Sequence, residues 1–209
     1  IARLYGHHKG IEMPAIIVME KAFHGRTIAT LSATGSRTVQ AGFEPLVPGF
    51  ARVPFDDLLA IKKVAENNRN VVAILVELIQ GEGGVNICHP DYLHGLRQIC
   101  DANGWLLMLD EVQSGVGRTG KAFAAQSFGV TPDILTMAKA LTNGAQPMGA
   151  VAVSERVHDT IMAAAQDGAT EFFHGPRHPA PPPPPPAPPP PPPTPRPSGT
   201  REPRPPPPP

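Results

Sequence analysis

The sequence predicts an α/β fold in which helices cover both faces of a mainly parallel sheet. One observation is a set of short, continuous apolar runs, which are typical of strands buried on both faces. A second is the amphipathic helical pattern between several of these runs, because alternating strands and helices build parallel sheets. The third is that most of the 29 prolines lie at or beyond Pro176. About 175 residues are therefore left to form one domain with a core.

The expected strands follow directly from the apolar runs. They cover residues 15–19, 71–76, 105–109, 133–138 and 149–154. The first ten residues are typical of the end of a helix that has already begun, and the chain starts at Ile1 without a methionine. We therefore expect a fragment of a longer protein.

Two helices are expected between the central strands. Asp56 is the expected N-cap of the first helix, because a short acidic side chain can accept a hydrogen bond from a free backbone N–H. The second helix is expected to end at Gly104, since glycine suits the left-handed position after a helix. Their inward faces would carry Leu58, Ile61, Val64 and Ala65 in the first and Tyr92, Leu93, Leu96, Ile99 and Cys100 in the second.

Residues 176–209 have a composition that cannot build a core. Proline lacks the amide donor and has a fixed φ, so this segment is expected to be disordered or to form an extended polyproline II rod. One interpretation is a catalytically inactive scaffold that recruits SH3 or WW domains through the tail. The other is a low-complexity extension or a reading-frame artefact.

Charge, hydropathy and cysteine content narrow the class of protein. The formal net charge is zero, which gives no reason to expect a nucleic-acid or membrane partner. No apolar run reaches the length of a membrane helix and no signal peptide begins the chain, so the cytoplasm is the expected location. The two cysteines are expected to be reduced thiols. A zinc site made of Cys88, His89, His94 and Cys100 would need a spacing that common zinc sites do not have, and no metal is predicted.

Three of the predicted strands end in a chemically active side chain. Glu77, Asp110 and Lys139 each follow an apolar run. Because ligands of parallel sheets bind outside the carboxyl ends of the strands, we expect the three side chains to converge at one edge. The glycine-rich connection over residues 77–90 is long for an α/β unit and suits a binding loop.

A nucleotide-binding loop is an alternative interpretation of residues 115–122. The sequence GVGRTGKA fits the first seven positions of a P-loop, which would make the chain an ATPase. However, Ala122 stands where the P-loop has a hydroxyl for the metal ion. The acidic strand also runs straight into this loop instead of lying elsewhere in the sequence.

Four motifs in order resemble the class III pyridoxal-phosphate aminotransferases. They are FHGRTIATLSATG at 23–35, VELIQGEGGV at 76–85, LLMLDEVQSGVGRTG at 106–120 and TPDILTMAKALTNGAQPMGAV at 131–151. The resemblance is strongest to acetylornithine and ornithine aminotransferases, with ω-amino-acid:pyruvate aminotransferase features. It implies that residues 1–175 are part of the large domain of a fold type I enzyme. It also implies a homodimer that transfers an amino group from a donor such as N-acetylornithine or ornithine to a 2-oxo acid.

The resemblance assigns two catalytic residues. Lys139 would bind the aldehyde of the cofactor covalently and later transfer a proton between substrate and cofactor. Asp110 would face the pyridine nitrogen, where an anionic carboxylate keeps the nitrogen protonated so that the ring can accept electrons. Such a charge-assisted hydrogen bond contributes about 1.5–3 kcal/mol.

The resemblance also assigns the residues that contact the cofactor and substrate. Phe23 would stack on the cofactor ring, with His24 and Gly25 of the same motif beside it. Gln113 would donate a hydrogen bond to the phenolic oxygen.

The resemblance assigns two further residues to substrate binding. Arg26 would bind a substrate carboxylate, and Glu77 would pair with an arginine that binds substrate.

Three features depart from the family pattern. Leu78 stands where relatives usually have proline. The glycine-rich segment and the threonine motif that relatives offer to the cofactor phosphate would lie before Ile1 and after Gly175, and this sequence contains neither.

Overall fold

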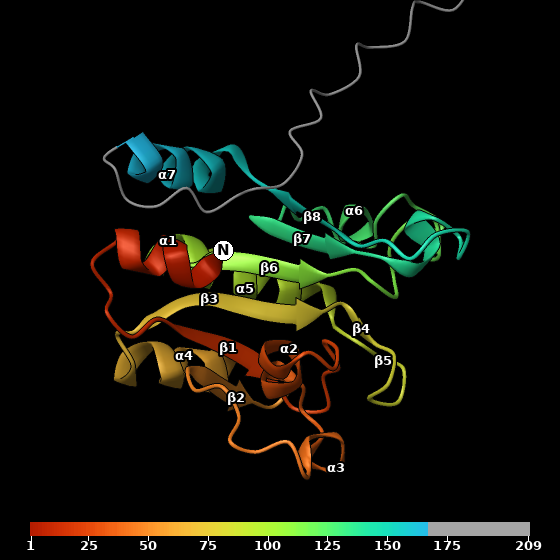
Figure 1. The fold of residues 1–209 in the computed structure, drawn as a ribbon, viewed down its shortest axis with the longest axis horizontal. Helices are drawn as coiled ribbons and strands as arrows, with labels where there is room; N and C mark the ends of the chain where they lie inside the picture. The colour runs from red at the N-terminus through yellow and green to blue at the C-terminus, as the bar shows by residue number, and fades with distance from the viewer. Residues whose placement is uncertain (167–209) are drawn as a thin grey trace, which may run out of the picture. The chain divides into compact units, whose positions relative to one another are not determined.

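The computed structural model describes residues 1–166, and the proline-rich tail expected at 176–209 lies outside them. A six-stranded sheet of order β2-β1-β3-β6-β7-β8 forms the centre of this part (Figure 1). Its strands are β1 Ala15–Met19, β2 Phe50–Val53, β3 Val71–Glu77, β6 Leu106–Asp110, β7 Ile134–Met137 and β8 Ala150–Val153. All neighbours pair in parallel except β7 and β8, which are antiparallel. The short strands β4 Ile79–Gln80 and β5 Asn86–Ile87 form a separate antiparallel pair.

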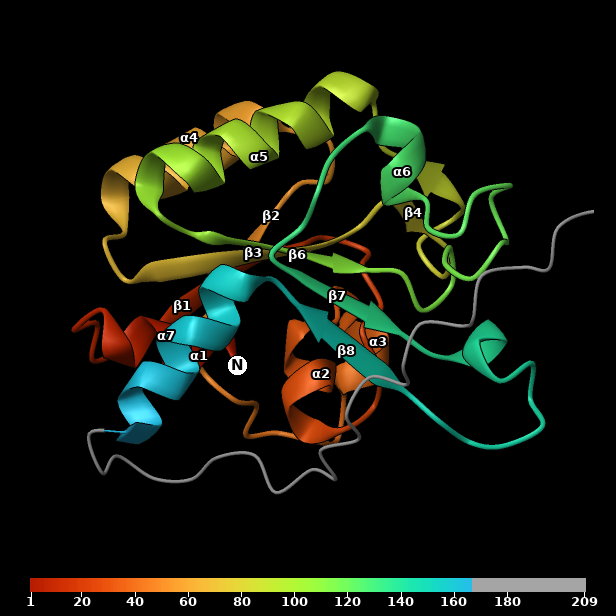
Figure 2. The ribbon, with the colours of Figure 1, turned by 90° about the horizontal axis from the view of Figure 1, so that it is seen from above.

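Helices cover both faces of the sheet, as the sequence predicts (Figure 2). One face carries α4 Leu58–Asn67, α5 Pro90–Asn103 and α6 Ala125–Phe128. The other carries α1 Ala2–His8, α2 Ile28–Ala33, α3 Arg37–Gln40 and α7 Glu155–Gln166. The predicted α/β class with a mainly parallel sheet is therefore confirmed.

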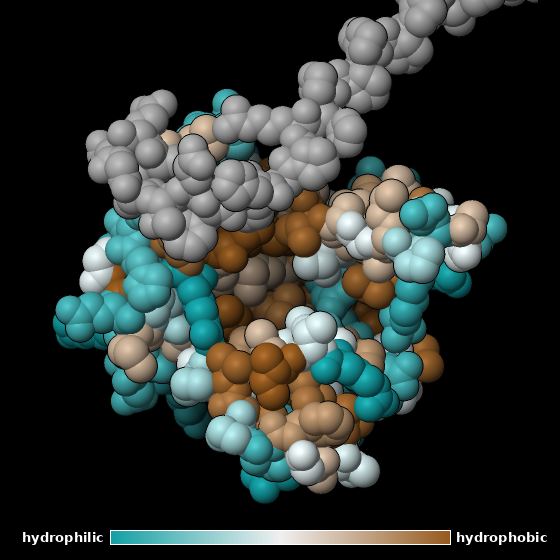
Figure 3. Space-filling model, viewed as in Figure 1, coloured by the Kyte–Doolittle hydropathy of each residue, from teal (hydrophilic) through white to brown (hydrophobic). Residues whose placement is uncertain are grey.

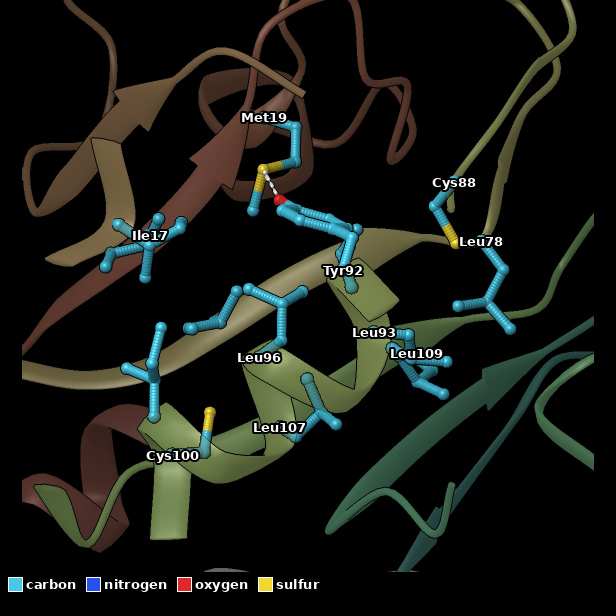
Figure 4. Close-up of a cluster of buried hydrophobic side chains, with 14 of the residues drawn as sticks. Ile17, Met19, Leu78, Cys88, Tyr92, Leu93, Leu96, Cys100, Leu107 and Leu109 are labelled. Atoms are coloured by element: carbon cyan, nitrogen blue, oxygen red, sulfur yellow. Dashed lines mark hydrogen bonds between the residues drawn. The ribbon is translucent and has the colours of Figure 1, made fainter. Parts of the chain in front are cut away.

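Side chains alternate between two cores because successive residues of a strand point to opposite faces. In β1, Ile17 and Met19 belong to the core under α4 and α5, whereas Ile16 and Val18 belong to the core under α1 and α7. Figure 4 shows the first core, where the Tyr92 hydroxyl lies 3.1 Å from the Met19 sulfur. Each fully buried aliphatic side chain contributes about 1.5–3 kcal/mol to folding. Cys88 and Cys100 are buried free thiols of this core, and burial raises the pKa of each to about 12.

The predicted helix stripes are confirmed, but one predicted cap is wrong. Asp57, not Asp56, is the N-cap of α4, and its carboxylate accepts a hydrogen bond from the Ala60 amide at 2.9 Å. Asp56 has a positive φ of 63° and instead accepts a hydrogen bond from the His89 amide, at the start of α5. The two adjacent aspartates thus serve different helices. Gly104 ends α5 in the left-handed conformation, with φ 66°, as predicted.

Strand β2 and the antiparallel direction of β8 were not predicted. β2 contains Arg52, whose charge interrupts the apolar pattern. Its guanidinium donates hydrogen bonds to the Ser32 and Thr34 carbonyls at the end of α2, at 3.0 and 2.8 Å. The charge is therefore used to hold α2 against the edge of the sheet.

One face of the molecule is only partly covered by helices. Viewed as in Figure 1, the surface is hollowed in its middle, and apolar residues line much of the hollow (Figure 3). Apolar side chains are also exposed on the edge strand β8, where Val151 and Val153 are 53% and 38% exposed. Within residues 1–166, no helix combines the length and apolarity needed to cross a membrane.

Candidate active site

The carboxyl ends of β3, β6 and β7 bring polar side chains to one edge of the sheet. Glu77 is the register partner of Asp110, and Asp110 is the register partner of Thr136. Lys139 follows β7 by two residues and begins a short 3₁₀ helix, Lys139–Leu141. A cavity of about 230 Å³ opens at this edge. Its lining consists of Phe23, His24, Gly25, Glu77, Asp110, Val112, Gln113 and Lys139.

The structure therefore gathers all but one of the predicted site residues around one cavity. The exception is Arg26, which lines a neighbouring cavity of about 310 Å³. Phe23 lines both cavities, and the Arg26 guanidinium lies 5.9 Å from the centre of the Phe23 ring. Arg26 is thus a neighbour of the same aromatic side chain that lines the cavity containing Asp110 and Lys139.

Both oxygens of the Asp110 carboxylate are held by hydrogen bonds. Oδ2 lies 2.8 Å from Nδ1 of His24, whose side chain is 2% exposed. Oδ1 accepts hydrogen bonds from the Val112 amide at 3.1 Å and from the Thr136 hydroxyl at 3.2 Å. Because a carboxylate held from several sides cannot rotate freely, its direction toward the cavity is fixed.

Glu77 lies beside Asp110 but in a different environment. Its side chain is buried, and its Oε2 accepts a hydrogen bond from the Phe23 amide at 2.9 Å. Burial raises the pKa of Glu77 to about 7, and the negative charge of Asp110 adds to this rise. The Phe23 and Gly81 backbone groups and His24 oppose the rise.

Lys139 has an unusual backbone conformation. Its φ is 46°, in the left-handed region that side chains other than glycine rarely adopt. Such a conformation costs about 1–3 kcal/mol and is common at functional sites. Here it turns the chain directly after β7, where the Lys139 side chain lines the cavity.

Glu111 organises the loop that follows β6. Its carboxylate is 1% exposed and accepts hydrogen bonds from the Ala124 and Ala125 amides, both at 2.7 Å. It also accepts one from the Ser114 hydroxyl at 3.1 Å. These hydrogen bonds join the start and the end of the loop that carries Gln113.

The same loop does not support the P-loop alternative. It leads into α6, a helix of four residues, and so lacks the phosphate-binding helix that a P-loop requires.

Three residues of this site were missed by reasoning from the sequence. Val112 lines the cavity, Thr136 supports Asp110, and Glu111 anchors the loop. The parallel register of β6 and β7 could have found Thr136, because it places that residue beside Asp110. The sequence contains no comparable signal that distinguishes the role of Glu111 from that of Asp110. Only the folded structure shows which carboxylate lines the cavity and which one binds the loop.

Comparison with known proteins gives a consistent family. The profile described as "Aminotransferase class-III" matches residues 1–176. The acetylornithine aminotransferase of Nitrosomonas europaea is 66% identical over 150 residues, which is 72% of this chain and 38% of that protein. The acetylornithine aminotransferase of Methanocaldococcus jannaschii is 49% identical over 148 residues, or 71% of this chain and 36% of that protein. The chain therefore spans less than half the length of these relatives.

Solved structures show the same likeness. The ornithine aminotransferase of Toxoplasma gondii superposes with a TM-score of 0.72 at 37% identity, covering 76% of this chain and 38% of that one. An (S)-enantioselective ω-transaminase of Thermomicrobium roseum superposes with a TM-score of 0.75 at 32% identity, covering 83% of this chain and 42% of that one. The sheet, the motifs and these similarities agree, and the chain belongs to the class-III aminotransferases.

Proposed function

We propose that the chain is part of an enzyme that transfers an amino group from an amino-acid or ω-amino donor to a 2-oxo acid with pyridoxal phosphate. N-Acetylornithine or ornithine is the proposed donor, because the relatives of this chain include acetylornithine and ornithine aminotransferases. Residues 1–175 are proposed to be part of the cofactor-binding large domain. A homodimer in the cytoplasm is the proposed state of the whole enzyme.

The observation that carries this proposal is the placement of Asp110 and Lys139 on one cavity. The residues around this cavity fit the cofactor: an acid, an amine, an amide and an aromatic ring match its ring nitrogen, aldehyde, phenolic oxygen and ring face. When bound, pyridoxal phosphate supplies an aldehyde that binds amines and a ring that stabilises negative charge at the substrate carbon.

The residues of the chain have distinct proposed roles. Asp110 holds a proton on the ring nitrogen, while His24 and Thr136 keep its carboxylate directed into the cavity. Lys139 holds the cofactor through its Nζ atom and then carries a proton to and from the substrate carbon. Phe23 packs against the ring.

Gln113, Arg26 and Glu77 complete the proposed site. Gln113 donates a hydrogen bond to the phenolic oxygen of the cofactor. Arg26, beside Phe23, binds a carboxylate of the donor from the neighbouring cavity. Glu77 lies at the wall next to Asp110, and its proposed role is to pair with an arginine that binds substrate.

Borohydride trapping of the cofactor tests this proposal. The chain is mixed with pyridoxal phosphate, reduced with borohydride and digested, and the peptide masses are measured by mass spectrometry. We expect a visible absorbance band and a reduced cofactor mass on the peptide that contains Lys139. K139A should lose both signals, while K62A, which removes an exposed lysine of α4, should keep them. A folded wild-type chain without the band, or with the mass on other lysines only, would reject the proposal.

A further inference from the structure

Gly81, at the start of the glycine-rich loop, lies close to the side chain of Gln113, which lines the candidate active site. A Cβ atom added to Gly81 would lie 2.8 Å from Oε1, 3.0 Å from Cδ and 3.1 Å from Nε2 of Gln113. Real Cβ atoms are essentially never found closer than 3.0 Å to a heavy atom. The absence of a side chain at Gly81 is therefore what lets the Gln113 amide occupy its present position.

The backbone at Gly81 is held in place by its neighbours. Gln80 is fully buried, and its Nε2 donates a hydrogen bond to the Glu20 carbonyl at 2.8 Å. Gln80 also pairs with Asn86 across the β4–β5 ladder, and Asn86 donates a hydrogen bond to its Oε1 at 3.2 Å. A Cβ atom at Gly83 would lie 2.7 Å from the Lys21 carbonyl oxygen, so the next turn of the loop is equally close to its neighbour. The loop cannot move away from Gln113 without breaking these contacts.

The backbone at Gln113 is fixed as well. Before it, the Val112 amide donates a hydrogen bond to Asp110, and after it the Gly115 amide donates one to the Glu111 carbonyl at 2.9 Å. Because both backbones are held, the methyl group of an alanine at position 81 would be accommodated most easily by rotation of the Gln113 side chain. Such a rotation costs little stability, but it would remove the amide from the place where it lines the cavity.

We propose that Gly81 is a positioning residue that sets the direction of the Gln113 amide toward the cofactor. This role rests on the proposed function, in which Gln113 binds the phenolic oxygen of pyridoxal phosphate. The φ angle of Gly81 lies outside the left-handed region, so an alanine can adopt the backbone conformation there. Functional side chains must be held within about 0.5 Å of their working geometry, which the added methyl group prevents.

The test compares wild type, G81A, Q113A and the double variant G81A/Q113A. G95A is the matched control. Gly95 lies on α5, and the atoms nearest to a Cβ atom added there likewise belong to a flexible side chain, that of Leu58 on α4. The affinity for pyridoxal phosphate is measured by absorbance titration. The side-chain amide resonance of Gln113, assigned by its absence in Q113A, is followed by NMR in the cofactor-free protein.

We expect G81A to shift the Gln113 amide resonance and to weaken cofactor binding about tenfold, similar to Q113A. The double variant should bind like Q113A alone, and G95A should bind like wild type. An unchanged Gln113 resonance in G81A, wild-type affinity in G81A, or additive losses in the double variant would each overturn the inference. A wild-type chain that binds no pyridoxal phosphate would reject the proposed function, and the role of Gly81 with it.

Discussion

Replacing Glu77 with glutamine should change how stability depends on pH. The pKa of this carboxyl is raised from its ordinary 4.5 to about 7, mainly by burial. A group with a raised acid pKa binds more protons in the folded than in the unfolded state, so unfolding becomes easier as pH rises from 4.5 through 7. A shift of about 2.5 pKa units corresponds to about 3 kcal/mol of stability that is present in acid and lost above pH 7. Glutamine does not ionise and can still accept the hydrogen bond from the Phe23 amide through Oε1.

Urea unfolding of wild type and E77Q over this pH range measures the effect. Between about pH 5 and pH 8, the free energy of unfolding of E77Q should rise relative to wild type by about 2.5 kcal/mol. E66Q is the control, because Glu66 is an exposed glutamate of α4 whose replacement should leave the pH dependence parallel to wild type. Parallel curves for E77Q and wild type would refute the inference that burial raises the pKa of Glu77.

Three substitutions away from the cavity test how the fold supports the site. D133N should lower the free energy of unfolding by about 3 kcal/mol in urea melts, because Asp133 is buried and accepts hydrogen bonds from Arg97 at 2.8 Å and Arg156 at 2.6 Å. E111Q should cost about 1–3 kcal/mol, since its amide would face a backbone donor, and should speed tryptic cleavage in the loop after β6. D57A should cost about 1 kcal/mol through loss of the α4 cap, while D57N should remain within a few tenths of wild type; equal losses would exclude the cap.

Most of the fold could be predicted because its signals are local. β1, β3 and β6 are continuous apolar runs, and the stripe of α5 ends at a glycine, so pattern and propensity agree there. β2 could not be predicted in this way, because the charged side chain of Arg52 interrupts its apolar pattern. The presence of Arg52 is explained only by its contact with the end of α2, which is distant in the sequence. The choice between Asp56 and Asp57 as cap also depends on a distant contact, since the first of them is used by the start of α5.

The candidate site shows the same division between local and distant information. Strand ends predicted that Asp110, Lys139 and Glu77 meet at one edge of the sheet, and the three residues do line one cavity. The sequence did not show that Arg26 lies in a neighbouring cavity, because the turn between Phe23 and α2 decides where its side chain points. The supporting contacts of Thr136 and Gly81 likewise exist only once the strands and loops are assembled.

The register of β3 and β6 explains why the two neighbouring carboxylates can serve different purposes. Glu77 and Asp110 lie side by side, so their negative charges repel each other. Asp110 faces a histidine and accepts hydrogen bonds at its other oxygen, whereas burial and the nearby negative charge raise the pKa of Glu77. With a pKa of about 7, Glu77 is the carboxyl that takes up a proton as the pH falls toward neutrality. In the proposed function, Asp110 is the carboxylate that faces the ring nitrogen, so two neighbouring strand ends supply carboxyl groups whose different environments suit them to different roles.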